Sequence, residues 1–338
     1  MQSKIILVVT TISGPNKVLR ELAAGCQLSQ WNFIIIGDTK TPSHFFLEGS
    51  EYYDINAQIA TGLEYAKLCP TKHYARKNIG YLLAIQQEAE QIVETDDDNI
   101  PLDSFWQEKC LEIKSKIIDN AGWINVYKYF SEATIWPRGL PLDKVNDRVA
   151  PYEELSESLS ECVIQQSLAN ENPDVDAIYR LILPLPQDFK DNVNLALGKD
   201  SWCPFNSQNT YWFPDAYPLL YLPAYCSFRM TDIWRSFVAQ RICWENNWRI
   251  LFHSPTVYQE RNIHNLMQDF EQEIPGYLHN KKIAQLLSEV KLITGKNEIL
   301  DNLRKCYDAL IENEIFPPKE GDLLEVWLKD INSVITIK

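Results

Sequence analysis

Three consecutive aspartates, Asp96, Asp97 and Asp98, follow a short apolar run that ends at Thr95. The run over residues 91–95 is rich in β-branched residues and indicates a buried strand, so the aspartates stand where this strand leaves its sheet. Adjacent carboxylates repel one another, and a divalent cation offsets that repulsion. Hard cations take oxygen ligands and complete their shell with substrate phosphates and water. The pattern predicts a metal–diphosphate site; the alternative is a solvated Asp-rich turn that caps the next helix.

The elements that must position these aspartates begin with a strand–helix–strand unit. Residues 4–10 and 31–37 have the composition of buried strands, residues 16–26 have helical spacing, and a further helix is expected over residues 74–89. This order predicts a parallel sheet, whose strands end side by side at the edge where ligands bind. Polar residues at that edge could bind a base and ribose or merely cap the strand ends, and both readings stay open; they are Thr10, Asp38 and Lys40.

Two cations open the helix that precedes the aspartate strand. Arg76 and Lys77 stand at its start, where positive side chains and a helix N-terminus together favour a phosphate group. For Lys77 an ordinary exposed cation is the alternative. The chain has neither a Gly-x-Gly-x-x-Gly run nor a Gly-x-x-x-x-Gly-Lys-[Ser/Thr] loop, so neither dinucleotide nor P-loop chemistry is supported.

The bulk composition limits the class of protein. The chain has 338 residues, with 32 Lys and Arg against 46 Asp and Glu, and its net charge of −14 argues against a sequence-independent nucleic-acid binder. Its 8 cysteines are dispersed without a Cys-x-x-Cys pair, which is typical of reduced core residues in a cytosolic protein. No run of eighteen apolar residues is present, so we expect a soluble, cytoplasmic protein without a membrane span, with peripheral membrane association left open.

The second half of the chain predicts a mixture of strands and helices. Strand-like segments occur at 176–183, 210–214 and 249–252, and residues 231–244 have the pattern of a helix. Residues 264–314 are mostly helical in pattern with Pro275 interrupting them, and a last helix extends to the C-terminus. We expect an α/β domain over residues 1–270, with a helical extension over residues 271–338 packed on it.

Eight segments of unusual composition occur in the same order as in a known family. They are YARKNIGYL (74–82), ETDDDN (94–99), IWPRGLPL (135–142), DVDAIYRL (174–181), FNSQNT (205–210), FRMTDIWR (228–235), QRICW (240–244) and RNIH (261–264). In these segments the chain resembles the STELLO-type glycosyltransferases. The resemblance implies a GT-A-type, Rossmann-like fold, in which helices flank a mostly parallel central sheet, and a nucleotide-sugar donor.

The resemblance also implies roles for the acidic residues. In GT-A enzymes a motif such as Asp96–Asp98 holds Mn²⁺ or Mg²⁺ against the donor diphosphate, with Asp96 and Asp98 as metal ligands and Asp97 as a further donor contact. His264 is a candidate third metal ligand, since imidazole and carboxylates can share such a cation, although an isolated histidine is more often structural. Asp232 is expected to act as general base in an inverting reaction, or to position the sugar in a retaining one; a helix N-cap is the alternative.

A more distant resemblance connects the chain to the reversibly glycosylated polypeptides, which are UDP-arabinopyranose mutases. In that family the arginine of an Arg-Gly turn carries the transferred sugar, which points to Arg138 here. The residues around Arg138 depart from the mutase pattern.

The acceptor is expected to lie near the aromatic stretch between residues 202 and 228. Asn206 and Asn209 are predicted to bind sugar hydroxyls, and some of the large aromatics could form a platform for a sugar while at least half belong to the core. These aromatics are Trp202, Phe205, Tyr211, Trp212, Phe213 and Tyr217.

Together these features predict a metal-dependent hexosyl- or pentosyltransferase. It would move a sugar from a nucleoside diphosphate sugar, a UDP-sugar, to a hydroxyl of a carbohydrate, glycan or glycolipid acceptor. The alternatives are a nucleotide-sugar mutase and an inactive scaffold of the same fold. Nucleic acid is not an expected partner, and assembly into a homo-oligomer is left open.

Overall fold

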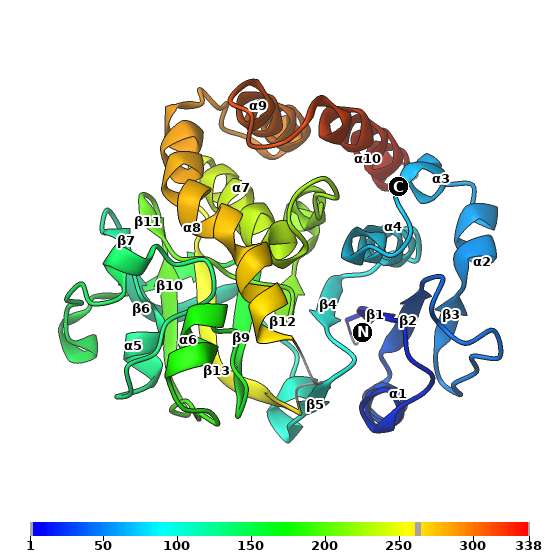
Figure 1. The fold of residues 1–338 in the computed structure, drawn as a ribbon, viewed down its shortest axis with the longest axis horizontal. Coiled ribbons are helices and arrows are strands. Elements are labelled where there is room, and N and C mark those ends of the chain that lie inside the picture. The colour runs from blue at the N-terminus through cyan, green and yellow to red at the C-terminus, as the bar shows by residue number, and fades with distance from the viewer. Residues whose placement is uncertain (1–2, 261–264, 337–338) are drawn as a thin grey trace.

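The computed structural model describes residues 3–260 and 265–336, which fold around an eleven-stranded mixed sheet (Figure 1). Its strand order is β3-β2-β1-β4-β12-β9-β13-β10-β6-β8, and β5 pairs with β13. The predicted α/β class, with helices flanking a central sheet, is confirmed. The strands of this sheet are β1 (Ile5–Thr11), β2 (Asn32–Gly37), β3 (Glu51–Tyr53), β4 (Gln91–Thr95), β5 (Asn99–Pro101), β6 (Glu112–Ile118), β8 (Glu157–Glu161), β9 (Ile164–Asn170), β10 (Asn194–Leu197), β12 (Asn209–Trp212) and β13 (Ile250–Gln259).

The N-terminal part of the sheet is parallel throughout. Strands β3, β2, β1 and β4 pair in this order, with Thr10 opposite Ile36 and Thr11 opposite Gly37. Both faces of β1 and β2 are covered, which explains why their sequences are continuous apolar runs instead of alternating ones. The carboxyl ends of β1, β2 and β4 therefore meet at one edge, as predicted.

Antiparallel strands join this part of the sheet to the rest. Strand β12 runs antiparallel to both β4 and β9, and Asn209 lies opposite Thr95. Strand β12 thus begins where β4 ends, which brings the segment before β12 to the same edge as the three aspartates. Beyond β9, parallel pairs alternate with antiparallel ones, and β7 (Gly122–Trp123) and β11 (Ser201–Trp202) form a separate two-stranded sheet.

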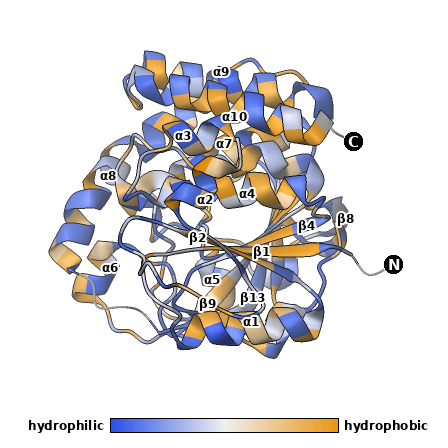
Figure 2. Ribbon diagram, turned by 90° about the vertical axis from the view of Figure 1, so that its right-hand side faces the viewer, coloured by the Kyte–Doolittle hydropathy of each residue, from blue (hydrophilic) through white to orange (hydrophobic). Residues whose placement is uncertain are grey.

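The helices form layers on the sheet (Figure 2). Helix α1 lies on one face, α4 and α7 lie on the other, and α9 and α10 form a further layer over α7 and α4. The α-helices are α1 (Lys17–Ser29), α2 (Ile55–Ala60), α3 (Glu64–Leu68), α4 (Lys77–Gln86), α5 (Tyr127–Phe130), α6 (Ala177–Ile182), α7 (Thr231–Glu245), α8 (Leu266–Glu289), α9 (Ile299–Glu312) and α10 (Pro318–Thr336). The 3₁₀ helices include η1 (Tyr74–Arg76) before α4, η5 (Pro214–Leu220) and η6 (Phe228–Met230) before α7.

Two expectations from the sequence are wrong. Residues 176–183 do not form a strand: Asp176 caps helix α6 by accepting a hydrogen bond from the backbone N–H of Tyr179, and this cap outweighs the strand-like run of Ile and Leu. Pro275 does not interrupt the C-terminal helical region, because α8 continues through it from Leu266 to Glu289. Helix α8 also spans the predicted boundary between residues 270 and 271, and the division into two domains stays a prediction.

The remaining bulk expectations concern membranes and cysteines. Among the described helices, none is both long and apolar enough to cross a bilayer. Each of the eight cysteines is free, and six of them are buried.

Candidate active site

A cavity of about 610 Å³ opens at the carboxyl edge of β1, β2 and β4. One side, here called the strand-end wall, consists of Thr10–Ser13, Ile36–Lys40 and Asp96–Asp98. The other side, the arginine wall, consists of Arg138, Asp174, Arg180, Phe228, Arg229 and Asp232. Lys72, His73, Tyr74, Gln208 and Gln259 complete the lining. Of the predicted site residues, the lining contains Thr10, Asp38, Lys40, Asp96, Asp97, Asp98, Arg138 and Asp232.

Asp96 is the most constrained of the three aspartates. Its Oδ1 accepts a hydrogen bond from the Tyr74 hydroxyl (2.8 Å) and lies 3.4 Å from Lys77 Nζ. Burial raises the pKa of the Asp96 carboxyl to about 6 although Lys77 opposes the shift, and the neighbouring Asp98 raises the pKa further. The Asp96 carboxylate is therefore poorly compensated by the protein alone.

Lys77 is a buried side chain that contacts the start of the aspartate loop. Its side chain is fully buried, and Nζ donates to the Thr95 carbonyl and to the Tyr74 hydroxyl oxygen at 2.8 Å each. Lys77 is thus neither the exposed cation nor the phosphate ligand that the sequence left open. It fixes the end of β4, where the aspartates begin.

Asp97 and Asp98 anchor the loop on its two sides. Asp97 Oδ2 accepts from the Thr11 hydroxyl at 2.5 Å, and the Asp97 carbonyl accepts from the Asn16 side chain, which also caps α1. Asp98 Oδ1 accepts from Gln259 Nε2 at 3.0 Å. The loop is therefore held by β1, α1 and β13, with all three aspartates still bordering the cavity.

The aspartate loop suits a hard divalent cation by its chemistry. Carboxylate oxygens are the ligands that Mg²⁺ and Mn²⁺ take, and a cation would relieve the repulsion between Asp96 and Asp98. Within residues 3–260 and 265–336, no three His, Cys, Asp or Glu side chains converge into a complete metal site. Mg²⁺ in nucleotide enzymes is commonly held by one or two carboxylates plus substrate phosphates, so a partial protein shell fits such a cation.

The predicted base and ribose contacts lie along the strand-end wall. Asp38 uses its carboxylate locally, because Oδ1 accepts from the backbone N–H of Thr39 (2.6 Å) and Oδ2 from that of His73 (3.0 Å). These bonds tie the end of β2 to the turn before α4, which matches the capping alternative, while Asp38 still borders the cavity. Lys40 and Lys72 are exposed cations at the cavity rim.

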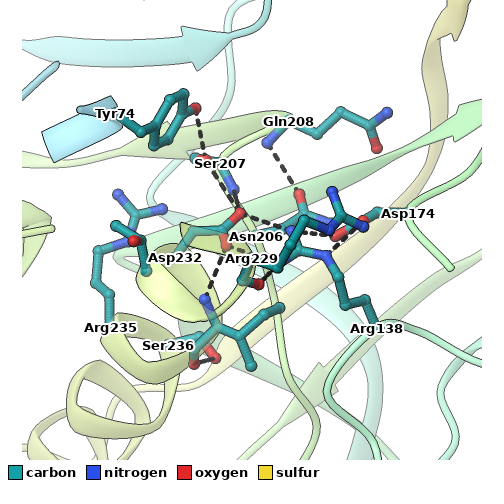
Figure 3. A network of polar contacts seen from close by, with 12 residues as sticks. Tyr74, Arg138, Asp174, Asn206, Ser207, Gln208, Arg229, Asp232, Arg235 and Ser236 are labelled. Carbon is teal, nitrogen blue, oxygen red and sulfur yellow. Dashed lines mark hydrogen bonds and ion pairs between the residues drawn. The ribbon is translucent and has the colours of Figure 1, made fainter. Parts of the chain in front are cut away.

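Arg138 lies between two carboxylates on the arginine wall (Figure 3). Nε and Nη2 donate to the two oxygens of Asp174 at 2.8 Å each, and Nη1 and Nη2 donate to the two oxygens of Asp232 at 3.0 Å each. Nη1 also donates to the Arg229 carbonyl. A guanidinium has five N–H donors, so these bonds use all of them.

Asp232 is a strongly stabilised anion. Burial opposes its ionisation, but Arg138 more than compensates and lowers the pKa of Asp232 to about 2. Its oxygens also accept from the backbone N–H groups of Ser207 (3.2 Å) and Ile233 (3.0 Å), the latter within the first turn of α7. A general base works best when its pKa is near the working pH, and in this arrangement Asp232 is suited to orienting Arg138 more than to removing a proton.

A chain of polar contacts connects the two walls. The Tyr74 hydroxyl donates to Asp96. It also lies 2.7 Å from the Ser207 hydroxyl, which in turn is 3.2 Å from Asp232 Oδ2 (Figure 3). Asn206, the residue before Ser207, donates from Nδ2 to Asp174 Oδ2 at 2.8 Å. The segment before β12 therefore contacts both Tyr74, which binds Asp96, and the two carboxylates that bind Arg138.

Comparison with known proteins finds similarity to one group of glycosyltransferases. A family model described as STELLO glycosyltransferases matches residues 229–336, from the arginine wall through α10. The chain is 25% identical over 356 aligned residues to the probable glycosyltransferase STELLO1 of Arabidopsis thaliana, and 28% identical over 347 to the probable glycosyltransferase STELLO2 of the same plant. The chain is related to the STELLO glycosyltransferases. The resemblance expected from the eight segments is confirmed.

The alignments differ in how much of each protein they cover. They include 98% and 96% of this chain but 45% and 44% of STELLO1 and STELLO2, so the chain spans less than half the length of either relative. Among solved structures, one described as a mycobacterial protein covers 82% of this chain and 74% of its own, at 8% identity and a TM-score of 0.40. That similarity is too low to bear on function.

The structure places several predicted contacts away from the cavity. Arg76 is buried, and its guanidinium donates to the Gln58 side chain and to the Cys69 carbonyl. Asn209 donates to the Thr256 hydroxyl and to the Leu168 carbonyl between β12, β9 and β13. Both positions argue for a structural role, and His264 lies outside the described residues.

The six aromatics predicted as an acceptor platform lie in the core, since each is at most 7% exposed and none is part of the cavity lining. An aromatic that does border the cavity is Phe228, which is 50% exposed and packs edge-on against the rings of His73 and Tyr74. The sequence offered no means of separating Phe228 from its buried neighbours.

Two central residues of the site were not predicted from the sequence. Asp174 binds Arg138, and Tyr74 binds Asp96; neither was considered as a site residue. Both stand in segments that carry the family resemblance, at positions 74–82 and 174–181. Their place in those segments was the available signal.

Proposed function

We propose that this chain is a metal-dependent glycosyltransferase that uses a nucleoside diphosphate sugar, a UDP-sugar, and transfers the sugar to a hydroxyl acceptor. The observation that carries the proposal is the aspartate loop at the end of β4, which faces a cavity large enough for a nucleotide. The relation to the STELLO glycosyltransferases supports a sugar donor and an acceptor.

The charge pattern of the cavity supports a diphosphate ligand. An anion would be repelled by Asp96, Asp97 and Asp98 unless a cation lay between them and the phosphates. Asp96 and Asp98 would hold that cation, and it would stabilise the negative charge that develops on the departing diphosphate. Lys40 and Lys72 at the rim would add attraction for the nucleotide, and Thr10 lies where a base or ribose would reach the end of β1.

The state of Arg138 disfavours the mutase alternative. Attack by a guanidinium on a sugar needs a nitrogen with an available lone pair, whereas every N–H of Arg138 is donated to Asp174, Asp232 or the Arg229 carbonyl. The two carboxylates also raise the pKa of Arg138, against the effect of burial. We therefore assign Arg138 to holding Asp174 and Asp232 in place.

Isothermal titration tests the proposal directly. UDP should bind in the presence of Mn²⁺ and much more weakly without it, and Asp98→Ala should remove the metal-dependent part of the binding while the thermal melting curve stays that of a folded protein. Asp191→Ala changes an exposed aspartate outside the cavity lining; it is the matched control and should bind as the wild type does. Equal UDP binding with and without Mn²⁺ would contradict the metal role, and absent binding would favour the scaffold alternative.

A further inference from the structure

Two aspartates of the arginine wall face the same guanidinium but differ in how fully they are hydrogen-bonded. Four N–H groups, two from Arg138 and the backbone N–H groups of Ser207 and Ile233, donate to Asp232, and the Ser207 hydroxyl lies 3.2 Å from Oδ2. An ionised carboxylate offers about four lone-pair sites. Asp232 therefore has no acceptor capacity left for a substrate in this arrangement of the described residues.

Asp174 is different. Its Oδ2 accepts from Arg138 Nη2 and from Asn206 Nδ2, and among the described residues Oδ1 has one donor, Arg138 Nε. Three donors against about four sites leave one lone pair of Oδ1 for another group. The Asp174 side chain borders the cavity, and the residue is 8% exposed, so a ligand in the cavity can reach it.

The backbone holds Asp174 in this position. Its carbonyl accepts from the backbone N–H of Arg138 (2.9 Å), so main chain and side chain both tie the two residues together. Helix α6 starts three residues later, at Ala177, where Asp176 caps it and the buried Glu273 of α8 accepts from the N–H of Ala177. A carboxylate held this firmly, with one site open to a cavity, is preorganised for a substrate group.

We propose that Asp174 is the carboxylate that takes the proton of the acceptor hydroxyl. This inference rests on the proposed function. In a single displacement, the acceptor oxygen forms a bond to the anomeric carbon of the donor, and its proton moves to Asp174 Oδ1. The bond between the anomeric carbon and the diphosphate oxygen breaks, and its electron pair leaves with the nucleoside diphosphate. Arg138 and Asp232 position Asp174, and water later removes the proton.

The test uses water and azide as alternative acceptors, because azide attacks without giving up a proton. The full-length chain is incubated with Mn²⁺ and UDP-glucose, UDP-galactose or UDP-arabinopyranose, and released UDP is measured. Asp174→Asn should lower water-dependent UDP release by about 10²-fold or more, the contribution of a general base. Azide should restore UDP release in Asp174→Asn, with a glycosyl azide as product, and should change the wild type little.

Asp232→Asn is the matched control, because it removes the other carboxylate that binds Arg138. It should lower UDP release by disturbing Arg138, and azide should not restore it. Rescue of Asp232→Asn in place of Asp174→Asn would overturn the proposal and return the base role to Asp232. Unchanged water-dependent release by Asp174→Asn, or a loss that azide does not restore, would also overturn it.

A measurement on the wild type avoids any doubt about the folding of the variants. Its water-dependent reaction should be slower in D₂O, whereas its azide reaction should not; equal solvent effects on both would overturn the assignment. Titration of the wild type with UDP and Mn²⁺ separates this inference from the proposed function. Absent binding refutes both, whereas intact binding with donors that release no UDP refutes the role of Asp174 alone, since the open cavity admits water to that residue.

Discussion

The two walls of the cavity are built in different ways. The strand-end wall comes from the βαβ unit of β1, α1 and β2 and from the end of β4, and its residues lie at or directly after the ends of strands whose composition is evident. The arginine wall brings together residues from the turn at Arg138, from the segment around the start of α6, from η6 and from the first turn of α7. The first wall can be predicted from local sequence patterns. The second wall forms only when distant parts of the chain pack together in the folded protein.

The difference between the two walls indicates which functional residues can be identified from the sequence alone. A carboxylate at the end of a parallel strand has a known place at the ligand edge. A carboxylate such as Asp174 acquires its meaning from a partner 36 positions away. Variants within each wall and between the walls test whether the two walls behave as one site or as two.

The largest effect is expected from the buried ion pair that joins the walls. Arg235 of α7 donates to both oxygens of Glu94 in β4, at 2.7 and 3.1 Å, and both side chains are at most 1% exposed. Arg235→Met leaves Glu94 buried without its cation and should lower the free energy of unfolding by about 3–5 kcal/mol in urea titration.

The double variant Glu94→Gln/Arg235→Met should lose less than the sum of the single variants, because neither charge is then left alone. Arg304→Met is the control, since Arg304 binds Glu325 at the surface and its loss should cost about 1 kcal/mol or less. If Arg235→Met lowered the free energy of unfolding no more than Arg304→Met does, the Glu94–Arg235 ion pair would not be what holds β4 and α7, and with them the two walls, together.

A smaller effect is expected where Tyr74 bridges the walls. Tyr74→Phe removes the hydroxyl that binds Asp96 and contacts Ser207, and it leaves the ring in place. Groups that orient metal ligands typically contribute about 10- to 100-fold to metal affinity, so Mn²⁺ affinity measured with UDP should fall by that factor. Tyr53→Phe, which removes a hydroxyl bonded to Glu51 outside the cavity, should leave Mn²⁺ affinity unchanged. Equal affinities for both variants would leave Tyr74 with a packing role alone.

Asn209 tests the difference between a buried framework and a binding wall. Asn209→Ala leaves the Leu168 carbonyl and the Thr256 hydroxyl without their donor and should reduce the free energy of unfolding by about 1–2 kcal/mol. The affinity for UDP and Mn²⁺, measured by titration, should not change because Asn209 lies outside the cavity. A clear loss of affinity with unchanged stability would restore the ligand contact to hydroxyl groups that was predicted for Asn209 from the sequence.

The smallest effect is expected at the rim of the strand-end wall. Lys40→Ala removes an exposed cation, and exposed charge pairs contribute about 0.2–1 kcal/mol, so UDP affinity should fall by a factor of about five at most. The difference from the wild type should shrink as salt is added, because ions screen exposed charges. Lys199→Ala, exposed and outside the cavity lining, serves as control. A salt-independent loss would point to a direct hydrogen bond instead.

The sequence predicted those parts of the fold and site that depend on local pattern. Strand β4 occurs where the apolar run indicated it, at Gln91–Thr95, and the aspartates face the cavity as expected. Arg76 could not be distinguished from a phosphate ligand, because its partners Gln58 and Cys69 are brought to it by packing. Similarly, the apolar run at 177–182 fits a strand until the Asp176 cap is taken into account.

The C-terminal helix α10 has a consequence for how the protein could close on a ligand. The buried Glu320 side chain accepts from the Tyr221 hydroxyl and from the N–H groups of Ala224 and Tyr225, which lead toward α7. Asp330, which lies ten residues further along α10, accepts a hydrogen bond from the backbone N–H of Tyr65 at the start of α3. Helix α10 is thus hydrogen-bonded both to the segment before α7 and to the start of α3. A hinge motion of one wall against the other would have to break one of these two sets of hydrogen bonds. A bound ligand would then be enclosed by movement of the side chains that line the cavity opening, while the backbone of the helices and strands stays in place.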